Sequence, residues 1–286
     1  MIKITECPRD ALQGMKKFIP TDKKIQWINT LLKVGYDILD FGSFVSPKVI
    51  PQLQDTEMVL EQLNLGDTYT QLLAIVPNLQ GTKRACKHKQ ISFLGYPHSV
   101  SETFLLRNIN SNIETSRNNI RDIVEYSSKY NKDVLVYISM CFGNIYGEHW
   151  NSDIVLSEID KLSSIGIKHI SLADTTGSGT AEDIGNVFKA VTNHFPDVSF
   201  NLHLHTSPNN WYDKVDSAYR NGCDHFDTVI NGLGGCPLAA SKLVGNLNTS
   251  LLLDYLEKNE IRSLINKNEF NKASFMAFEL FKNQHN

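Results

Sequence analysis

Eight short segments rich in β-branched and aromatic residues recur along this chain of 286 residues, and a stretch with helical periodicity follows each of them. Gly, Pro, Asn or Asp bounds the segments, as is usual for strands. The eight segments span residues 2–7, 37–44, 71–77, 90–96, 134–140, 169–175, 199–205 and 225–231. Strands that alternate with helices pair in parallel through right-handed crossovers, and eight of them close a barrel. The pattern therefore predicts an α/β fold, a (β/α)8 TIM barrel.

An open doubly wound sheet is the alternative fold for the same alternation. When such a sheet binds a dinucleotide, its first strand ends in a Gly-x-Gly-x-x-Gly turn, and the turn after residues 2–7 has no such motif. From Thr249 onward, apolar residues at helical spacing, among them Leu252, Phe275 and Phe278, predict extra helices that pack on the barrel. We expect one domain over residues 1–286, with the barrel over about 1–248 and terminal helices over about 249–286.

Charge and composition exclude several classes of protein. The formal net charge of -3 argues against a sequence-independent nucleic-acid binder, which needs a basic excess. No run approaches the roughly 18 apolar residues that a membrane span needs. The five cysteines form no Cys-x-x-Cys pair, and an odd count in a chain of this length indicates free thiols in a reducing compartment. The first strand begins almost at Met1, so we expect no targeting peptide and a cytosolic location.

Ionisable side chains gather where the predicted strands end. Barrel enzymes build their active sites from the carboxyl ends of the strands, so these positions converge on one mouth. The residues at these ends are Arg9, Asp10, Asp40, Asp174, His203 and His205, with Gly234, Gly235 and Cys236 after the last strand. The concentration of such groups at a single face predicts an active site there.

The sharpest local signal is His203-Leu204-His205. Strand residues two apart point to the same face, so both imidazoles enter the barrel while Leu204 packs outward. A pair of histidines on one face favours metal ligands over satisfied core residues. Asp10 can add a carboxylate from the first strand across the closed barrel. Asn246 can add a carbonyl oxygen, although a helix cap before Leu247 explains it equally well.

Two nitrogen and two oxygen ligands form a harder set than the thiolates of structural zinc sites. The set leaves room for two further oxygens in an octahedral arrangement, which suits Mg²⁺ or Mn²⁺, with Co²⁺ or Zn²⁺ also possible. The sequence therefore predicts a divalent metal as the cofactor.

Three further side chains at the mouth have two interpretations each. Arg9 places a permanent cation beside Asp10, where it can hold an oxyanion, or it closes the barrel as a structural Arg–Asp pair. Asp174 is either catalytic or structural, in the second case as a helix cap before Ala181 or as a hydrogen-bonded carboxylate at the rim. Asp40 has the same ambiguity.

The run Gly232-Leu233-Gly234-Gly235-Cys236-Pro237 combines three glycines with a thiol. A loop of this composition can bring Cys236 to the mouth of the barrel. The other four cysteines fall in strand or helix patterns, where burial as small apolar residues is expected. Cys236 is thus the cysteine whose setting favours reactivity.

Several blocks of the sequence resemble successive blocks of the hydroxymethylglutaryl-CoA lyase family. The blocks are Pro8–Gln13, Ser43–Lys48, Pro77–Gly81, Leu172–Thr175, His203–His205 and Gly232–Pro237. They occur in the same order and cover nearly the whole chain up to about residue 248. The Arg-Asp and His-x-His elements are shared with the wider superfamily of isopropylmalate and homocitrate synthases, whereas the Ser-Phe-Val-Ser-Pro-Lys and Gly-Leu-Gly-Gly-Cys-Pro blocks are much more specific to the lyases.

The resemblance implies a metal-dependent lyase that cleaves 3-hydroxy-3-methylglutaryl-CoA into acetyl-CoA and acetoacetate. The residues that it implies for metal binding are Asp10, His203, His205 and Asn246, and those that it implies for catalysis are Arg9, Asp174, Cys236 and Asp40, the last in the place of a family Glu. We assign Gln13 and Lys48 to contacts with the acyl-CoA substrate, and the resemblance also suggests a homodimer. A condensing synthase or a 4-hydroxy-2-oxoacid aldolase of the same superfamily is the alternative activity.

Overall fold

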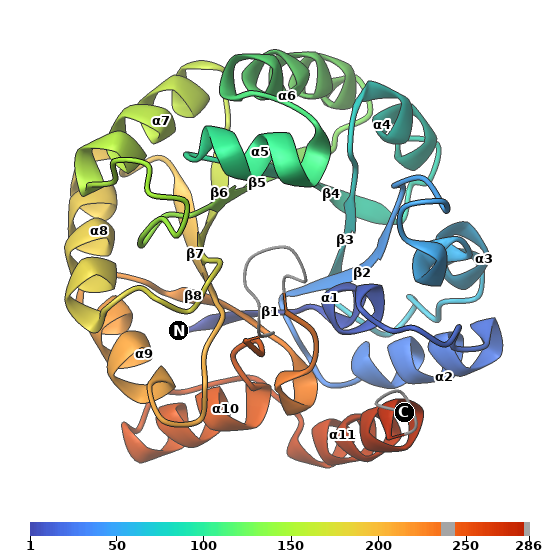
Figure 1. Cartoon of the computed structure of the whole chain (residues 1–286). Helices are drawn as coiled ribbons and strands as arrows, with labels where there is room; N and C mark the ends of the chain where they lie inside the picture. The colour runs from blue at the N-terminus through green and yellow to red at the C-terminus, as the bar shows by residue number, and fades with distance from the viewer. Residues whose placement is uncertain (236–243, 283–286) are drawn as a thin grey trace.

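The eight predicted strands form one closed parallel barrel. The structure, a computed structural model, describes residues 1–235 and 244–282. Each strand pairs with the next along the chain, and β8 pairs with β1 to close the ring (Figure 1). The strands are β1 (Lys3–Glu6), β2 (Ile38–Ser43), β3 (Gln71–Ile75), β4 (Ile91–Ser99), β5 (Asp133–Ser139), β6 (His169–Asp174), β7 (Ser199–Leu204) and β8 (His225–Thr228). The predicted fold is confirmed.

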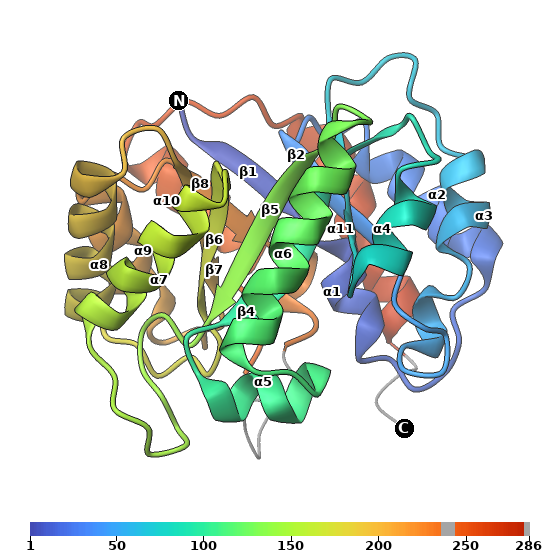
Figure 2. The ribbon, with the colours of Figure 1, turned by 90° about the horizontal axis from the view of Figure 1, so that it is seen from above.

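Helices surround the barrel on its outer side (Figure 1). The α-helices are α1 (Pro8–Gln13), α2 (Thr21–Leu31), α3 (Thr56–Glu61), α4 (Leu79–Ala85), α5 (Glu102–Ile109), α6 (Ile113–Ser128), α7 (Ser152–Ser164), α8 (Ala181–His194), α9 (Trp211–Arg220), α10 (Thr249–Lys258) and α11 (Lys267–Phe281), and two 3-10 turns are η1 (Pro51–Leu53) and η2 (Ile230–Gly232). The short helix α5 lies beyond the carboxyl ends of β4 and β5 (Figure 2). None of the helices in residues 1–235 and 244–282 is long and apolar enough to cross a membrane.

Two strand ends differ by three residues from the sequence-based expectation, and the other ends differ by at most two. β4 continues past the predicted end at Tyr96 as far as Ser99, because it stays in register with β5 over this stretch. β8 ends at Thr228, before the predicted end, because the chain turns into η2 at Ile230. These two strand ends depend on pairing with β5 and on the turn into η2, and local composition does not reveal either.

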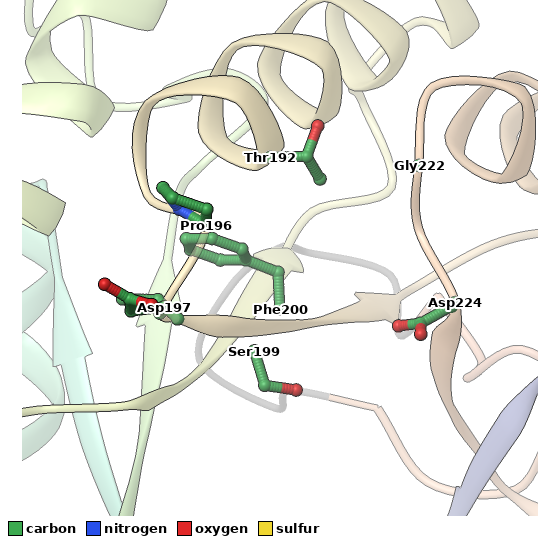
Figure 3. Close-up of a pocket in the computed structure, with 8 residues that line it drawn as sticks. Thr192, Pro196, Asp197, Ser199, Phe200, Gly222 and Asp224 are labelled. Carbon is green, nitrogen blue, oxygen red and sulfur yellow. The ribbon is translucent and has the colours of Figure 1, made fainter.

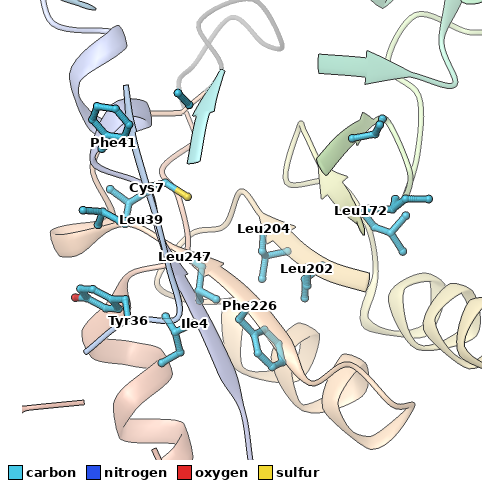
Figure 4. Packing of buried hydrophobic residues seen from close by; sticks show 14 of the residues in the cluster. Ile4, Cys7, Tyr36, Leu39, Phe41, Leu172, Leu202, Leu204, Phe226 and Leu247 are labelled. Carbon is cyan, nitrogen blue, oxygen red and sulfur yellow. The ribbon is translucent and has the colours of Figure 1, made fainter. Parts of the chain in front are cut away.

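The apolar core has two layers. A large cluster fills the space between the barrel and the helices, and it includes the outward-facing Leu172, Leu202, Leu204 and Phe226 (Figure 4). A smaller cluster lies inside the barrel and consists of Ile38, Leu73, Ile75, Phe93, Leu135 and Tyr137. Leu204 packs outward, as the two-residue period of β7 predicted. The inner layer on the side of β7 and β8 is polar.

The terminal helices begin at Thr249, as predicted. On α11, the residues at helical spacing that face the core are Phe270, Ala273, Ala277 and Phe281. The Trp27 ring of α2 lies 5.4 Å from the Phe281 ring, edge to face. The prediction that Phe275 and Phe278 pack on the barrel is wrong, because they lie on the opposite side of this helix and are 67% and 61% exposed.

Glu6 is a buried carboxylate on the outward face of β1. Its Oε1 atom accepts a hydrogen bond from Ile230 N (2.6 Å), and its Oε2 atom accepts from the hydroxyls of Thr228 (3.1 Å) and Thr249 (2.7 Å). Burial raises the pKa of Glu6 from 4.5 to about 7, although these donors act to lower it. Removal of an ionised carboxylate from water therefore costs more than its hydrogen bonds return.

The raised pKa predicts how stability depends on pH. The folded chain keeps the Glu6 proton to a higher pH than the unfolded chain, so the contribution of this group is complete below about pH 4.5 and is lost as the pH rises through about 7. Between about pH 5 and pH 8, the wild type should lose roughly 1–3 kcal/mol more unfolding free energy than Glu6→Gln. Urea denaturation of both proteins measures the difference. Equal pH slopes would contradict the assignment.

Candidate metal centre

Asp10, His203 and His205 converge at the carboxyl end of the barrel. His203 is on β7, His205 follows its last residue, and Asp10 lies in α1, which begins directly after β1. All three are buried, and one possible ligand atom from each lies within 4.8 Å of the others. The two imidazoles enter the barrel together, as predicted, with ring centroids 5.2 Å apart. Barrel closure brings the carboxylate to them.

Asn246 reaches the same cluster from the segment before α10. The segment forms an isolated bridge with the end of β7, at His205 and Asn246. The Asn246 Nδ2 atom donates to the carbonyl of Leu233 (2.8 Å), which leaves the carbonyl oxygen Oδ1 available as a ligand. The alternative role of Asn246 as a helix cap is wrong, because Asn248 caps α10 by accepting from Ser250 N.

Asp227 holds His203 from the side away from Asp10. The Nδ1 atom of His203 lies 3.2 Å from Asp227 Oδ2, whereas its Nε2 atom lies 3.6 Å from Asp10 Oδ2. Asp227 also accepts from the Ser171 hydroxyl (2.7 Å) and the Asn201 amide (2.9 Å). A carboxylate at Nδ1 fixes the ring and its tautomer, so that Nε2 is presented to a metal.

Electrostatics of the cluster favour a cation among these groups. Burial acts to raise the pKa of Asp10, but Arg9, His203 and His205 outweigh it and the pKa is lowered. Burial and the neighbouring His203 lower the pKa of His205 to about 4, so this imidazole is neutral. Its buried Nδ1 atom makes no hydrogen bond of good geometry within the described part of the chain. The carboxylates of Asp227 and Asp10 outweigh burial and raise the pKa of His203. A carboxylate, two imidazoles and an amide oxygen are a donor set that fits a divalent metal.

Arg9 is held beside Asp10 by three side chains. Its Nε and Nη2 atoms donate to Asp40 Oδ2 (2.9 and 2.6 Å), and its Nη1 atom donates to Gln13 Oε1 (2.9 Å) and Asp10 Oδ1 (3.4 Å). The Gln13 amide in turn donates to Asp10 Oδ1 (2.8 Å). The two interpretations of Arg9 are therefore compatible, because a structural ion pair fixes a cation next to the cluster. The Gln13 amide therefore contacts Asp10 through its nitrogen and Arg9 through its oxygen.

Asp40 and Tyr137 add polar atoms that face the interior. The Oδ1 atom of Asp40 and the hydroxyl of Tyr137 are buried and lack hydrogen-bond partners among residues 1–235 and 244–282. Burial raises the pKa of Asp40 to about 6, against the lowering effect of Arg9. The Tyr137 ring packs edge to face on His203, with centroids 5.8 Å apart.

Asp174 stands apart from this cluster. It pairs in register with Leu204, which places its side chain on the outward face of the barrel. Its Oδ2 atom accepts from Lys214 Nζ (2.7 Å) and its Oδ1 atom accepts from Gly179 N (3.1 Å). It does not cap α8, because Thr180 does so in a capping box. This geometry matches the second structural role predicted for Asp174, a hydrogen-bonded carboxylate at the rim of the barrel.

Of the remaining predicted residues, Gly234 and Lys48 lie in loops that follow strands of the barrel. Gly234 passes so close to Asp10 that a Cβ atom there would lie 2.6 Å from the Asp10 carbonyl oxygen, and its φ is +81°. Glycine is therefore required where the loop meets the cluster. Lys48 is exposed in the loop after β2. Cys236 lies outside the described residues, whereas the other four cysteines are buried, as expected.

A hollow lies at the opposite end of the barrel from Asp10, His203 and His205. Its volume is about 340 Å³, and its walls come from the loops that lead into β7 and β8, including Pro196, Ser199 and Asp224 (Figure 3). These loops lie at the amino ends of the strands, where barrel enzymes do not place catalytic groups. The side chains that could hold a metal are concentrated at the carboxyl end of the barrel.

Sequence and structural comparisons agree with this geometry. The HMGL-like family model matches residues 2–276. The chain belongs to the HMGL-like family. Among its relatives, the cytoplasmic 3-hydroxy-3-methylglutaryl-CoA lyase of Rattus norvegicus is 32% identical over 257 residues, which are 88% of this chain and 73% of the relative. A hydroxymethylglutaryl-CoA lyase of Bacillus subtilis is 31% identical over 261 residues, which are 90% of this chain and 85% of the relative.

A solved structure with the same barrel is that of an HMG-CoA lyase from Acinetobacter baumannii in complex with coenzyme A and 3-methylmalate. It superposes with a TM-score of 0.91 at 30% sequence identity, covering 99% of this chain and 92% of that chain. The resemblance to the hydroxymethylglutaryl-CoA lyase family is thus confirmed. The HMGL-like barrel of this chain carries the Asp10, His203 and His205 cluster at the end where such enzymes act.

Two residues of the site were not singled out from the sequence. Asp227 follows His225 by two positions and shares its inward face on β8, so the period of two was the available signal. Tyr137 likewise faces the inside of the barrel, on β5. Both have the pattern of ordinary strand residues until the folded sheet places them beside His203.

Replacement of Gln13 distinguishes its observed contacts from its predicted one. If its amide braces Asp10, Gln13→Leu should weaken Mn²⁺ binding about tenfold, as loss of a residue that orients a ligand does. If it contacts acyl-CoA instead, the Michaelis constant for the thioester should rise while metal affinity stays unchanged. Calorimetric titration with Mn²⁺ and steady-state kinetics on the same preparation separate the two results.

Proposed function

We propose that this chain is a divalent-metal-dependent hydroxymethylglutaryl-CoA lyase, which cleaves 3-hydroxy-3-methylglutaryl-CoA into acetyl-CoA and acetoacetate. The observation that carries the proposal is the buried cluster of Asp10, His203 and His205 beside the Arg9 guanidinium, in a barrel of the HMGL-like family. The lyase names of the rat and Bacillus subtilis relatives support it.

We assign the metal ligands to Asp10, His203, His205 and Asn246. Their oxygen and nitrogen atoms suit Mg²⁺ or Mn²⁺, with Co²⁺ or Zn²⁺ as alternatives. A divalent cation held there supplies Lewis-acid chemistry, because it lowers the pKa of a substrate hydroxyl and neutralises nearby negative charge. Asp227 orients His203 for this purpose, and Gln13 orients Asp10.

Asp40 is the base that we assign to the substrate hydroxyl. Asp174 is engaged by Lys214 and Gly179 on the outer face of the barrel, whereas Asp40 has a buried oxygen with no partner among the described residues. With a pKa of about 6, Asp40 is mostly ionised at neutral pH and is close to the ideal for accepting a proton there. Its other oxygen is fixed by Arg9.

Bond cleavage then follows from removal of the hydroxyl proton. The tertiary hydroxyl gives its proton to Asp40, its carbon becomes the ketone of acetoacetate, and the bond between C2 and C3 breaks. The electron pair of that bond passes to C2 and forms the enolate of acetyl-CoA, which takes a proton from the Cys236 thiol or from water. Arg9 makes four hydrogen bonds with side chains, which leaves at least one of its five N–H groups for a substrate oxyanion.

Recognition of the acyl-CoA involves the loops at the same mouth. Lys48 is exposed after β2 and can meet a phosphate of coenzyme A. Coenzyme A is present in the related Acinetobacter baumannii complex. A cytosolic location and a homodimer remain predictions from the cysteine content and from the family resemblance.

Metal-dependent cleavage tests the proposed function. The wild type should release acetyl-CoA from 3-hydroxy-3-methylglutaryl-CoA with Mg²⁺ or Mn²⁺ and lose this activity with EDTA. His205→Ala should lower the rate by about two orders of magnitude or more, since a metal ligand is lost. His194→Ala is the matched control, because His194 is an exposed histidine at the end of α8. Product formation from acetyl-CoA and a 2-oxoacid, without cleavage, would favour the synthase alternative instead.

A further inference from the structure

We propose that Glu6 is a positioning residue for Asn246, because it joins the segment before α10 to the end of β8 and so sets where the Asn246 side chain meets the metal centre. The inference rests on the proposed function, in which Asn246 is a metal ligand. Glu6 is outside the cluster and faces the outer layer, so it contacts neither the metal nor the substrate.

The hydrogen bonds of Glu6 connect two segments that are far apart in the sequence. Oε1 accepts from Ile230 N and Oε2 accepts from Thr228 Oγ1, both on the side of β8. Oε2 also accepts from the hydroxyl of Thr249, the first residue of α10 (2.7 Å). All of these residues are fully buried. One carboxylate therefore holds the chain where it leaves β8 and where it enters α10.

Asn246 lies three residues before Thr249 on a segment that main-chain hydrogen bonds also attach to the barrel. Beside Asn246, Thr206 N donates to Gly245 O (2.8 Å). Leu247 N donates to Leu204 O (2.8 Å), and Val229 N donates to Leu247 O (3.0 Å). Thr249 N donates to Val229 O (3.3 Å). The side-chain bond between Thr249 and Glu6 (2.7 Å) is the shortest of these five contacts, and it holds the end of the segment at the start of α10. Its loss should allow the end of the segment to shift.

The chemistry of Glu6 favours a positioning role over simple packing. An apolar residue would fill the same space between strand and helix at a lower cost than a buried carboxylate. Three directed hydrogen bonds fix the relative position of the two segments, which apolar contacts do with less precision. Metal ligands need placement to within about 0.5 Å, so a small shift of Asn246 has a measurable effect.

Two threonines provide a matched test, because Thr249 and Thr228 donate to the same oxygen of Glu6 and are equally buried. Thr249→Val frees the segment that carries Asn246, whereas Thr228→Val changes a strand that is already paired with β1. Titration with Mn²⁺ should show roughly tenfold weaker binding for Thr249→Val and nearly unchanged binding for Thr228→Val. Without metal, the midpoint temperature of thermal unfolding should fall to a similar extent in both variants.

Asn246→Ala separates failure of this inference from failure of the proposed function. If Asn246→Ala weakens Mn²⁺ binding and Thr249→Val does not, the ligand assignment stands and the role of Glu6 is refuted. Equal losses of affinity in Thr249→Val and Thr228→Val would also refute it, because they would indicate a general loss of stability. If Asn246→Ala binds Mn²⁺ as tightly as the wild type, both the ligand assignment and the inference fail.

Discussion

Pairing of β1 with β8 is the interaction on which the candidate site depends. It joins parts of the chain that lie 220 residues apart, as in the contact between Thr5 and His225. Because α1 begins directly after β1, closure places Asp10 beside the histidines of β7. Without closure the carboxylate and the imidazoles would lie at opposite edges of an open sheet.

The partners of each ionisable group separate the roles within the site. Asp10, Asp40, Asp174 and Asp227 are all buried carboxylates near strand ends. Asp227 is paired with His203, and Asp174 forms an ion pair with Lys214 on the outer face. Asp10 and Asp40 share Arg9, but Asp40 keeps one oxygen without a partner in the described part of the chain. In the proposed function, environment rather than residue type makes one carboxylate a ligand and another a base.

Local patterns predicted the fold and the inner histidines, whereas long-range contacts decided the rest. The alternation of strands and helices predicted the closed barrel, and the spacing of His203 and His205 predicted their shared face. Asp174 has the same residue type and the same strand-end position as the inward groups, yet it points outward, because its parity on β6 matches Leu204. The bracing of Asp10 by Gln13 is a contact between residues three apart on α1, which the spacing could have indicated. The orientation of His203 by Asp227 depends on a contact between β7 and β8 that no local pattern contains.

Anomalous scattering from crystals grown with Mn²⁺ tests directly whether four side chains at the carboxyl end of the barrel hold a divalent metal. We expect one strong peak about 2.0–2.3 Å from ligand atoms of Asp10, His203, His205 and Asn246. A cluster without a peak at millimolar Mn²⁺, or a peak bound by other side chains, would contradict it.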